Sequence, residues 1–154
     1  MAATLVEPHK SSIGNLDANI VALIAYLAAG VVGWIPIIGY VAWAVPLVFF
    51  FMEKQSAFVR FHSMQAFILN AISAVLSFLL VVVIGGIAMG SMNTVGNIYA
   101  AAGTVLLLGT IATIIGVIIT IFAIIALVNA LQYKTYRIPV IGDLADKFSS
   151  KMNL

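Results

Sequence analysis

The sequence contains no cysteine and very little charge. Only 8% of its 154 residues are Asp, Glu, Lys or Arg, against about 25% in an ordinary soluble domain. The absence of cysteine excludes disulfides, thiolate metal sites, thiol catalysis and lipidated cysteine. The scarcity of charge, together with 64% hydrophobic residues and a mean hydropathy of +1.19, indicates an integral membrane protein.

Motifs that carry enzymatic chemistry are absent as well. There is no HExxH, no GxSxG, no P-loop glycine-lysine motif and no carboxylate inside the long apolar stretches. Hydrolase, NTPase and carboxylate-driven proton-relay mechanisms therefore lack their reagents. A net charge of +2, spread over short segments, does not form a nucleic-acid-binding surface. We expect no enzyme activity, cofactor, metal or nucleic-acid partner.

Two long uncharged runs determine the predicted architecture. Residues 18–52 form a run of 35 without a charge, and residues 61–133 form a run of 73. The first run would be about 52 Å long as one helix, too long for a single crossing of a hydrocarbon layer about 30 Å thick. Pro36 is expected to break it, because proline lacks an amide donor and glycines on either side loosen the backbone.

The second run is divided by turn-forming residues at 90–97, whose polar side chains would be costly to leave in lipid. The predicted fold class is an all-α membrane bundle with four transmembrane helices, at residues 17–34, 38–52, 61–89 and 98–132. The first pair is a proline-broken hairpin. Because the second helix is short and Pro46 would kink it, a re-entrant segment is the alternative.

All seven Lys and Arg residues fall outside the predicted helices. With four spans they lie on one side, and the positive-inside rule places both termini in the cytoplasm. We therefore expect a protein of the cytoplasmic (inner) membrane, with an N-terminal tail over 1–16, a transmembrane domain over 17–132 and a cytoplasmic tail over 133–154. Three aromatic residues would mark the outer interface: Trp34, Tyr40 and Tyr99.

Small and polar residues recur at helical spacing inside the spans. The predicted fourth helix carries a small-residue face at Gly109, Ala112, Gly116 and Ala123. Such a face lets helix backbones approach closely, and we predict that it packs against the chain's own helices or a neighbour. The predicted third helix carries three polar residues near one side: Asn70, Ser73 and Ser77. They form hydrogen bonds between helices or, alternatively, line a polar groove.

The segment FVRFHSMQA (58–66) stands directly before the second apolar run. Four of its residues share a helix face by i, i+3, i+4, i+7 spacing: Phe58, Phe61, His62 and Gln65. We interpret the segment as an interfacial anchor, in which Arg60 reaches lipid phosphates, the rings lie at the acyl boundary and His62 meets a carbonyl or water. A proton or ligand site at His62 is the alternative. Bis-histidine haem ligation is disfavoured, because the other histidine, His9, lies in a tail.

The C-terminal tail contains an apolar repeat every four residues: Leu144, Phe148 and Met152. Aspartates precede lysines along the same segment, which complements a helix dipole. We predict a short amphipathic helix on the cytoplasmic face of the membrane. A disordered tail that folds against a partner is the alternative.

Three segments resemble landmarks of a known family: NLDANIVALIAYL (15–27), EKQSAFVRFHSMQA (53–66) and YRIPVIGDLADK (136–147). The family comprises small uncharacterised bacterial and archaeal membrane proteins related to the small multi-spanning subunit of the chloroplast Tic translocon. The resemblance covers most of the chain and implies a fold more than a function. The inserted IPIIGYVAWAVP (35–46) departs from many prokaryotic members and is more similar to the four-helix organellar type.

Two functional hypotheses follow for a chain that has no catalytic reagents. The first is a non-enzymatic structural or assembly subunit of a larger membrane complex, whose partners are the lipid bilayer and other membrane subunits. The alternative, which the translocon resemblance implies, is a conduit for protein or solute. Because so small a chain encloses no obvious aqueous path alone, a conduit would need oligomers or partners. We favour the subunit.

Overall fold

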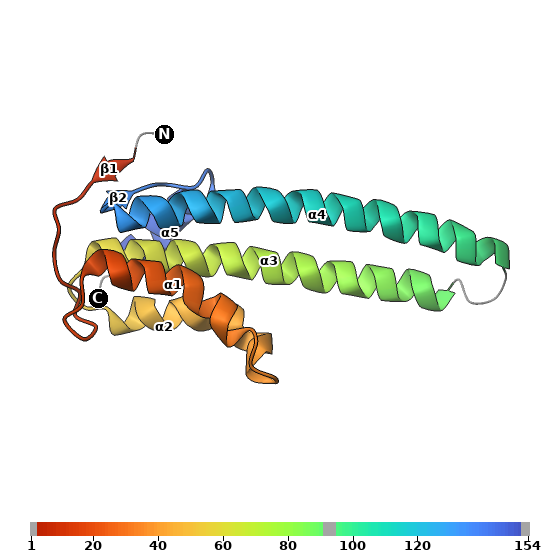
Figure 1. Ribbon diagram of the computed structural model, residues 1–154, viewed down its shortest axis with the longest axis horizontal. Helices are drawn as coiled ribbons and strands as arrows, with labels where there is room; N and C mark the ends of the chain where they lie inside the picture. The colour runs from red at the N-terminus through yellow and green to blue at the C-terminus, as the bar shows by residue number, and fades with distance from the viewer. Residues whose placement is uncertain (1–2, 91–94, 152–154) are drawn as a thin grey trace. The chain divides into compact units, whose positions relative to one another are not determined.

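The computed structural model describes residues 3–90 and 95–151 and is almost entirely helical (Figure 1). In chain order its elements are β1 (Thr4–Leu5), α1 (Ala18–Val32), the 3-10 helix η1 (Ile38–Ala44), α2 (Val45–Met52), α3 (Ala57–Gly90), α4 (Val95–Leu131), β2 (Lys134–Thr135) and α5 (Ile141–Lys151). β1 pairs antiparallel with β2, with Thr4 opposite Thr135. The predicted all-helical character is confirmed. Part of the predicted turn at 90–97, residues 91–94, lies outside the described residues.

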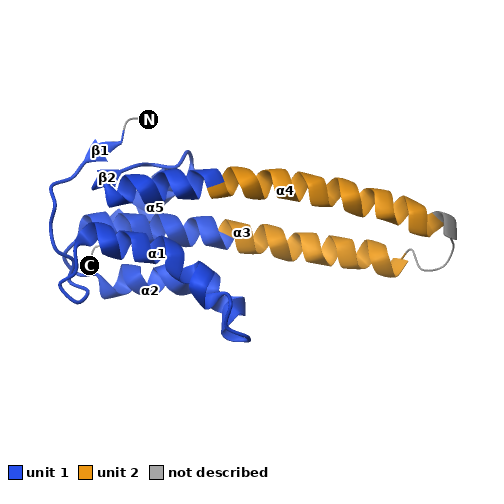
Figure 2. Ribbon diagram, in the orientation of Figure 1, with its two compact units in different colours: residues 1–71, 121–154 blue, residues 72–120 orange. Residues whose placement is uncertain are grey.

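The chain separates into two compact units (Figure 2). Unit 1 comprises residues 1–71 and 121–154, and unit 2 comprises residues 72–120. Unit 1 contains both short strands, α1, η1, α2, α5, the first turns of α3 and the last turns of α4. Unit 2 consists of the remainder of α3 and α4.

Only two helices among the described residues are long and apolar enough to cross a membrane, α3 with 34 residues and α4 with 37. The prediction of four transmembrane helices is therefore wrong. α1 has 15 residues and is about 22 Å long, whereas the hydrocarbon layer is about 30 Å thick. The second predicted helix is divided into η1, with 7 residues, and α2, with 8.

Close backbone approach explains why α1 ends where it does. A Cβ atom added at Gly39 would lie 2.6 Å from the carbonyl oxygen of Gly33, so a side chain does not fit there. Ile37, between them, has a φ of 70°, in the left-handed region. Pro46 does not kink a helix as predicted, because it lies in the first turn of α2, where its missing N–H group needs no partner.

Two apolar clusters hold unit 1 together. The first joins α1, α3 and α4 through Ala18, Val21, Ala22, Phe58, Val59 and Ala130. The second joins α2, α3 and α5 through Phe50, Phe61, Met64 and Ala145. All nine buried residues of α3 fall between Phe58 and Leu69, so the first third of this helix is the centre of the unit.

The prediction of an amphipathic C-terminal helix is wrong in part. A helix is present, but it is not clearly amphipathic. Leu144 and Phe148, of the predicted apolar stripe, are exposed by 37% and 49%, and Met152 lies outside the described residues. The buried residues are instead the small Gly142 and Ala145. α5 therefore packs against the rest of unit 1 through small residues.

Candidate functional site

The first turns of α3 begin at a buried serine cap. Ser56 is 2% exposed, and its Oγ accepts a hydrogen bond from the N–H group of Val59 at 3.1 Å. This is the ordinary N-cap contact, which satisfies one of the free donors at a helix start. The Nε2 atom of His9 lies 2.7 Å from the same Oγ, and its Nδ1 lies 2.8 Å from the carbonyl oxygen of Glu7. A serine and a histidine are thus paired, but the serine is occupied as a helix cap.

Glu53, directly after α2, is the centre of a buried hydrogen-bond network. Its carboxylate is 1% exposed and accepts hydrogen bonds from the hydroxyl of Ser11 and from the N–H and hydroxyl of Ser12, at 3.2 and 2.7 Å. The N–H groups of Gln55 and Ser56 donate to it at 2.9 Å each. The network ties the segment before α1 to the turn after α2.

The pKa of Glu53 reflects two opposing causes. Burial, the larger single cause, raises the pKa because it disfavours the charged form. The hydrogen bonds from Ser11, Ser56, Gln55 and Ser12 together outweigh burial and lower the pKa to about 2. The carboxylate is thus kept ionised by hydrogen bonds, and within the described ranges no Lys or Arg forms a salt bridge with it.

A second buried polar group connects α1, α3 and the C-terminal segment. The side-chain amide of Gln65 donates to the hydroxyl of Tyr26 at 2.9 Å and to the carbonyl of Tyr136 at 3.2 Å, and its oxygen accepts from the N–H of Ile138 at 3.2 Å. The Tyr26 hydroxyl lies 3.2 Å from Nδ1 of His62. Gln65 therefore fastens the segment after β2 onto α3.

His62 is fully buried and surrounded by rings. The ring centroids of Phe58 and Phe61 lie 4.5 and 5.3 Å from its own. Its Nδ1 lies 3.2 Å from the Tyr26 hydroxyl, while Nε2 is buried and has no hydrogen-bond partner among the described residues. If Nδ1 accepts from the tyrosine, the neutral ring carries its proton on Nε2.

The structure brings the five residues of the predicted anchor segment to one end of α3. Phe58, Phe61, His62 and Gln65 are buried in unit 1. Arg60 lies half-buried, with its guanidinium carbon 4.7 Å from the centroid of the Phe50 ring, a cation–π contact. The anchoring role itself stays a prediction.

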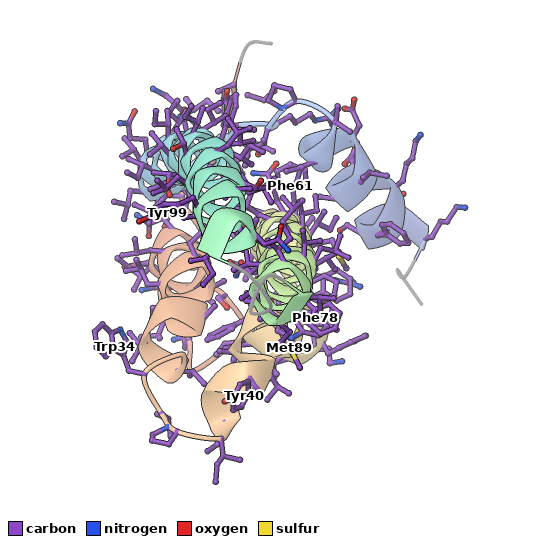
Figure 3. The ribbon with its side chains drawn as sticks, turned by 90° about the vertical axis from the view of Figure 1, so that its right-hand side faces the viewer. Trp34, Tyr40, Phe61, Phe78, Met89 and Tyr99 are labelled. Carbon is purple, nitrogen blue, oxygen red and sulfur yellow. The ribbon has the colours of Figure 1, made fainter. Side chains whose placement is uncertain are left out.

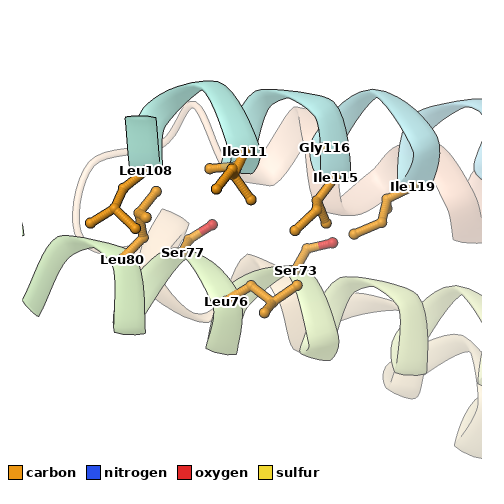
Figure 4. Close-up of a pocket in the computed structure, with 10 residues that line it drawn as sticks. Ser73, Leu76, Ser77, Leu80, Leu108, Ile111, Ile115, Gly116 and Ile119 are labelled. Carbon is orange, nitrogen blue, oxygen red and sulfur yellow. The ribbon is translucent and has the colours of Figure 1, made fainter. Parts of the chain in front are cut away.

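Residues from two predicted groups line one cavity in unit 2 (Figure 4). Its volume is about 200 Å³, and its walls include Ser73 and Ser77 from α3 and Ala112 and Gly116 from α4, among larger aliphatic side chains. The walls do not include Asn70, Gly109 or Ala123. Their roles in packing or in a groove stay predictions.

Several residues of the site escaped the sequence-based prediction. Glu53, Ser11 and Ser12 were not singled out, nor was Tyr26. One signal was available, since Glu53 is the single carboxylate between Asp17 and Asp143. A lone acid between two apolar runs is costly to bury unless it is hydrogen-bonded. Trp43, which was not among the predicted interface aromatics, packs against Phe67 with ring centroids 5.8 Å apart.

Comparison with known proteins gives the family. The chain belongs to the magnetosome magnetite crystal formation protein family, which matches residues 17–145. Two similar proteins are UPF0132 membrane proteins of Methanocaldococcus jannaschii. One is 28% identical over 135 residues, covering 87% of this chain and 71% of its own length, and the other is 27% identical over 141 residues, covering 91% and 94%. No solved structure matches.

These matches and the two long apolar helices show that the chain is a membrane protein and belongs to a family of small membrane proteins. The names of the family and of the two relatives designate no enzyme. The predicted membership of a family of small membrane proteins is confirmed at that level. The relationship to the Tic translocon subunit stays a prediction.

Proposed function

We propose that this family member is a non-enzymatic structural or assembly subunit of a larger membrane complex. The observation that carries the proposal is the loose packing of unit 2. Among its described residues with assigned burial, 72–90 and 97–120, no side chain is buried. α3 and α4 also leave the cavity of about 200 Å³ between them.

Helices in lipid associate through close packing and hydrogen bonds, since lipid tails supply no hydrophobic drive. Hydroxyl groups of α4 contribute little to association, because Thr113 and Thr120 donate to carbonyl oxygens of their own helix, both at 2.8 Å. A pair of helices that packs this loosely gains dispersion energy when further helices cover it. The proposed partners are therefore other membrane helices, from a second copy or another protein.

The distribution of charge supports an orientation. Lys54 precedes α3, Arg60 lies in its first turn, and Lys134 and Arg137 follow the end of α4. No charged residue lies between Arg60 and Lys134. By the positive-inside rule, these ends face the cytoplasm. We accordingly propose the cytoplasmic membrane as the location.

The family description concerns magnetite crystal formation. For this chain we propose only the part of such a role that its own residues support, a scaffold within the membrane. Of its five carboxylates, Glu53 is enclosed in hydrogen bonds, and Asp17 and Asp146 form salt bridges with Lys10 and Arg137, both at 2.8 Å.

Purification in a mild detergent tests the proposal. We expect the protein to elute as a particle larger than one 16.3 kDa chain plus its detergent, either as an oligomer or with other membrane proteins. Light scattering measures the protein mass, and mass spectrometry identifies any partner. A partner-free monomer would contradict the subunit proposal. If that monomer also passed solute in liposomes, the conduit hypothesis would replace it.

A pair of glycine variants tests which surface of α4 is used. Neither Gly116 nor Gly103 has another atom within 4 Å of an added Cβ, so each accepts a larger side chain without a clash at Cβ. Gly116 lines the cavity and Gly103 does not. We expect Gly116→Leu to insert normally but to lower the assembled fraction, and Gly103→Leu to leave it unchanged. Equal effects of the two variants would refute a role for this surface.

A further inference from the structure

The α1–η1–α2 hairpin, residues 18–52, presents an apolar tip that the protein does not cover. The hairpin contains no charged residue. At its tip, Trp34, Ile37 and Tyr40 are exposed by 89%, 83% and 86%, and Trp34 projects away from the ribbon (Figure 3). A contiguous exposed patch of this kind needs an apolar environment.

Both ends of the hairpin are held together at a polar boundary. The Glu53 carboxylate joins Ser11 and Ser12, before α1, to the backbone after α2. The N–H group of Lys54 also donates to Ser12 Oγ at 2.8 Å. Since charged residues flank the hairpin only at these joined ends, the chain enters and leaves an apolar phase on the same side.

Most backbone N–H groups of the turn at the tip have partners within the turn. Six N–H groups donate to nearby carbonyl oxygens at 2.8 to 3.3 Å: those of Gly33, Trp34, Ile35, Ile38, Gly39 and Tyr40. Pro36 has no N–H group, and Ile37 is the one residue from 33 to 40 whose N–H group donates no backbone hydrogen bond. A turn exposed to water does not need internal partners, whereas a backbone group without a partner in hydrocarbon costs several kcal/mol. This arrangement suits a turn immersed in lipid.

We propose that the hairpin is a re-entrant wedge, whose partner is the single lipid leaflet on the side of Lys10 and Lys54. It enters that leaflet, buries its tip in the acyl chains and returns. Two helices, each about 10 Å across, occupy about 160 Å² of the leaflet that they enter. Material added to one leaflet is accommodated best where that leaflet is convex. The hairpin therefore favours curved membrane in which the leaflet on the side of its charged ends is the convex one.

Native fluorescence can measure the depth of the tip. The two tryptophans of the chain, Trp34 and Trp43, both lie in the hairpin, so Trp43→Phe leaves Trp34 as the single reporter. The protein is placed in phosphatidylcholine vesicles brominated near either the headgroup end or the methyl end of the acyl chain. We expect stronger quenching by the deep bromine. Stronger quenching by the shallow bromine, or no quenching, would overturn the wedge.

Sorting between flat and curved membrane tests the consequence. A Ser150→Cys variant is reconstituted into giant vesicles and labelled with an impermeant fluorophore, so that only molecules with their charged ends outward are seen. Narrow tubes are then pulled outward from the vesicles. We expect a severalfold higher ratio of protein to lipid on the tube than on the vesicle. An equal ratio would refute the preference for curvature.

Two lysine variants complete the design. Ile37→Lys places a charge at the exposed tip and should remove both the deep quenching and the enrichment on tubes. Leu5→Lys is the matched control, because Leu5 is also exposed, by 71%, but lies in β1, outside the hairpin. It should preserve both signals. If Ile37→Lys retained both signals with a circular dichroism spectrum like that of the wild type, the tip would not be the inserting element.

Discussion

Replacing Glu53 with Gln should destabilise the protein by an amount that the structure sets. The substitution keeps the size of the side chain but removes the charge that five hydrogen-bond donors surround. Four of the donors bond Oε1, which the amide oxygen can replace only as an uncharged and weaker acceptor, and the NH₂ group would take the place of Oε2, which accepts from the Ser11 hydroxyl. A pKa lowered from 4.5 to about 2 corresponds to about 3 kcal/mol of stabilisation.

The pH dependence of this effect has a definite sign. Because the pKa of Glu53 is lowered in the folded state, its contribution is fully present above pH 4.5 and is lost as the pH falls through about 2. Between those values wild type should lose stability relative to Glu53→Gln, and the two should converge. Titration of the other groups is common to both proteins and cancels in the difference.

Thermal unfolding in detergent, followed by tryptophan fluorescence, measures the difference directly. At pH 7 we expect the melting temperature of Glu53→Gln to be lower by roughly 6–12 °C for a chain of this length. The control is Asp146→Asn, which removes an exposed salt bridge with Arg137 and should cost less than about 1 kcal/mol. Equal stability of Glu53→Gln and wild type at pH 7, or a difference that is unchanged at pH 2.5, would refute the reasoning.

Three other predictions concern separate parts of the chain. Gly39→Ala should destabilise the hairpin turn because its Cβ would meet the Gly33 carbonyl, whereas Gly30→Ala, with open space around it, should not; unfolding temperatures compare the two. Tyr26→Phe removes the contacts with His62 and Gln65 and should cost about 1–3 kcal/mol, while Tyr99→Phe, at an exposed position, should be silent in the same assay. If α3 and α4 are the two spans, an impermeant thiol reagent should label Asn93→Cys, outside the described residues, from one side of the membrane. It should label Glu7→Cys and Ser150→Cys from the other side. Labelling of all three variants from one side would exclude α3 and α4 as a pair of spans.

The candidate site was predictable where one helix carried the pattern and was missed where contacts joined distant segments. The i, i+3, i+4, i+7 spacing from Phe58 to Gln65 describes neighbours on a single helix, and all four residues are buried together. Two partners of Glu53, Ser11 and Ser12, by contrast, lie 42 and 41 residues earlier in the chain. No local periodicity relates Ser11 to Glu53, so only the cost of burying a lone carboxylate pointed to such a network.

The error in the number of spans has a physical cause of its own. The uncharged run at 18–52 was divided into two helices close to their observed positions, and counting residues then suggested two crossings. Charge distribution could not correct this, because two spans and four spans both place every Lys and Arg on one side of the membrane. An even number of crossings is all that the positive-inside rule reports here. The deciding quantity is the length of uninterrupted helix, which depends on where Gly33 and Gly39 bring two backbones into contact. The same contact that shortens α1 also closes the turn, in which six N–H groups have backbone partners. The contact that makes the helices of the hairpin too short to be two spans therefore also suits the hairpin to enter one leaflet and return.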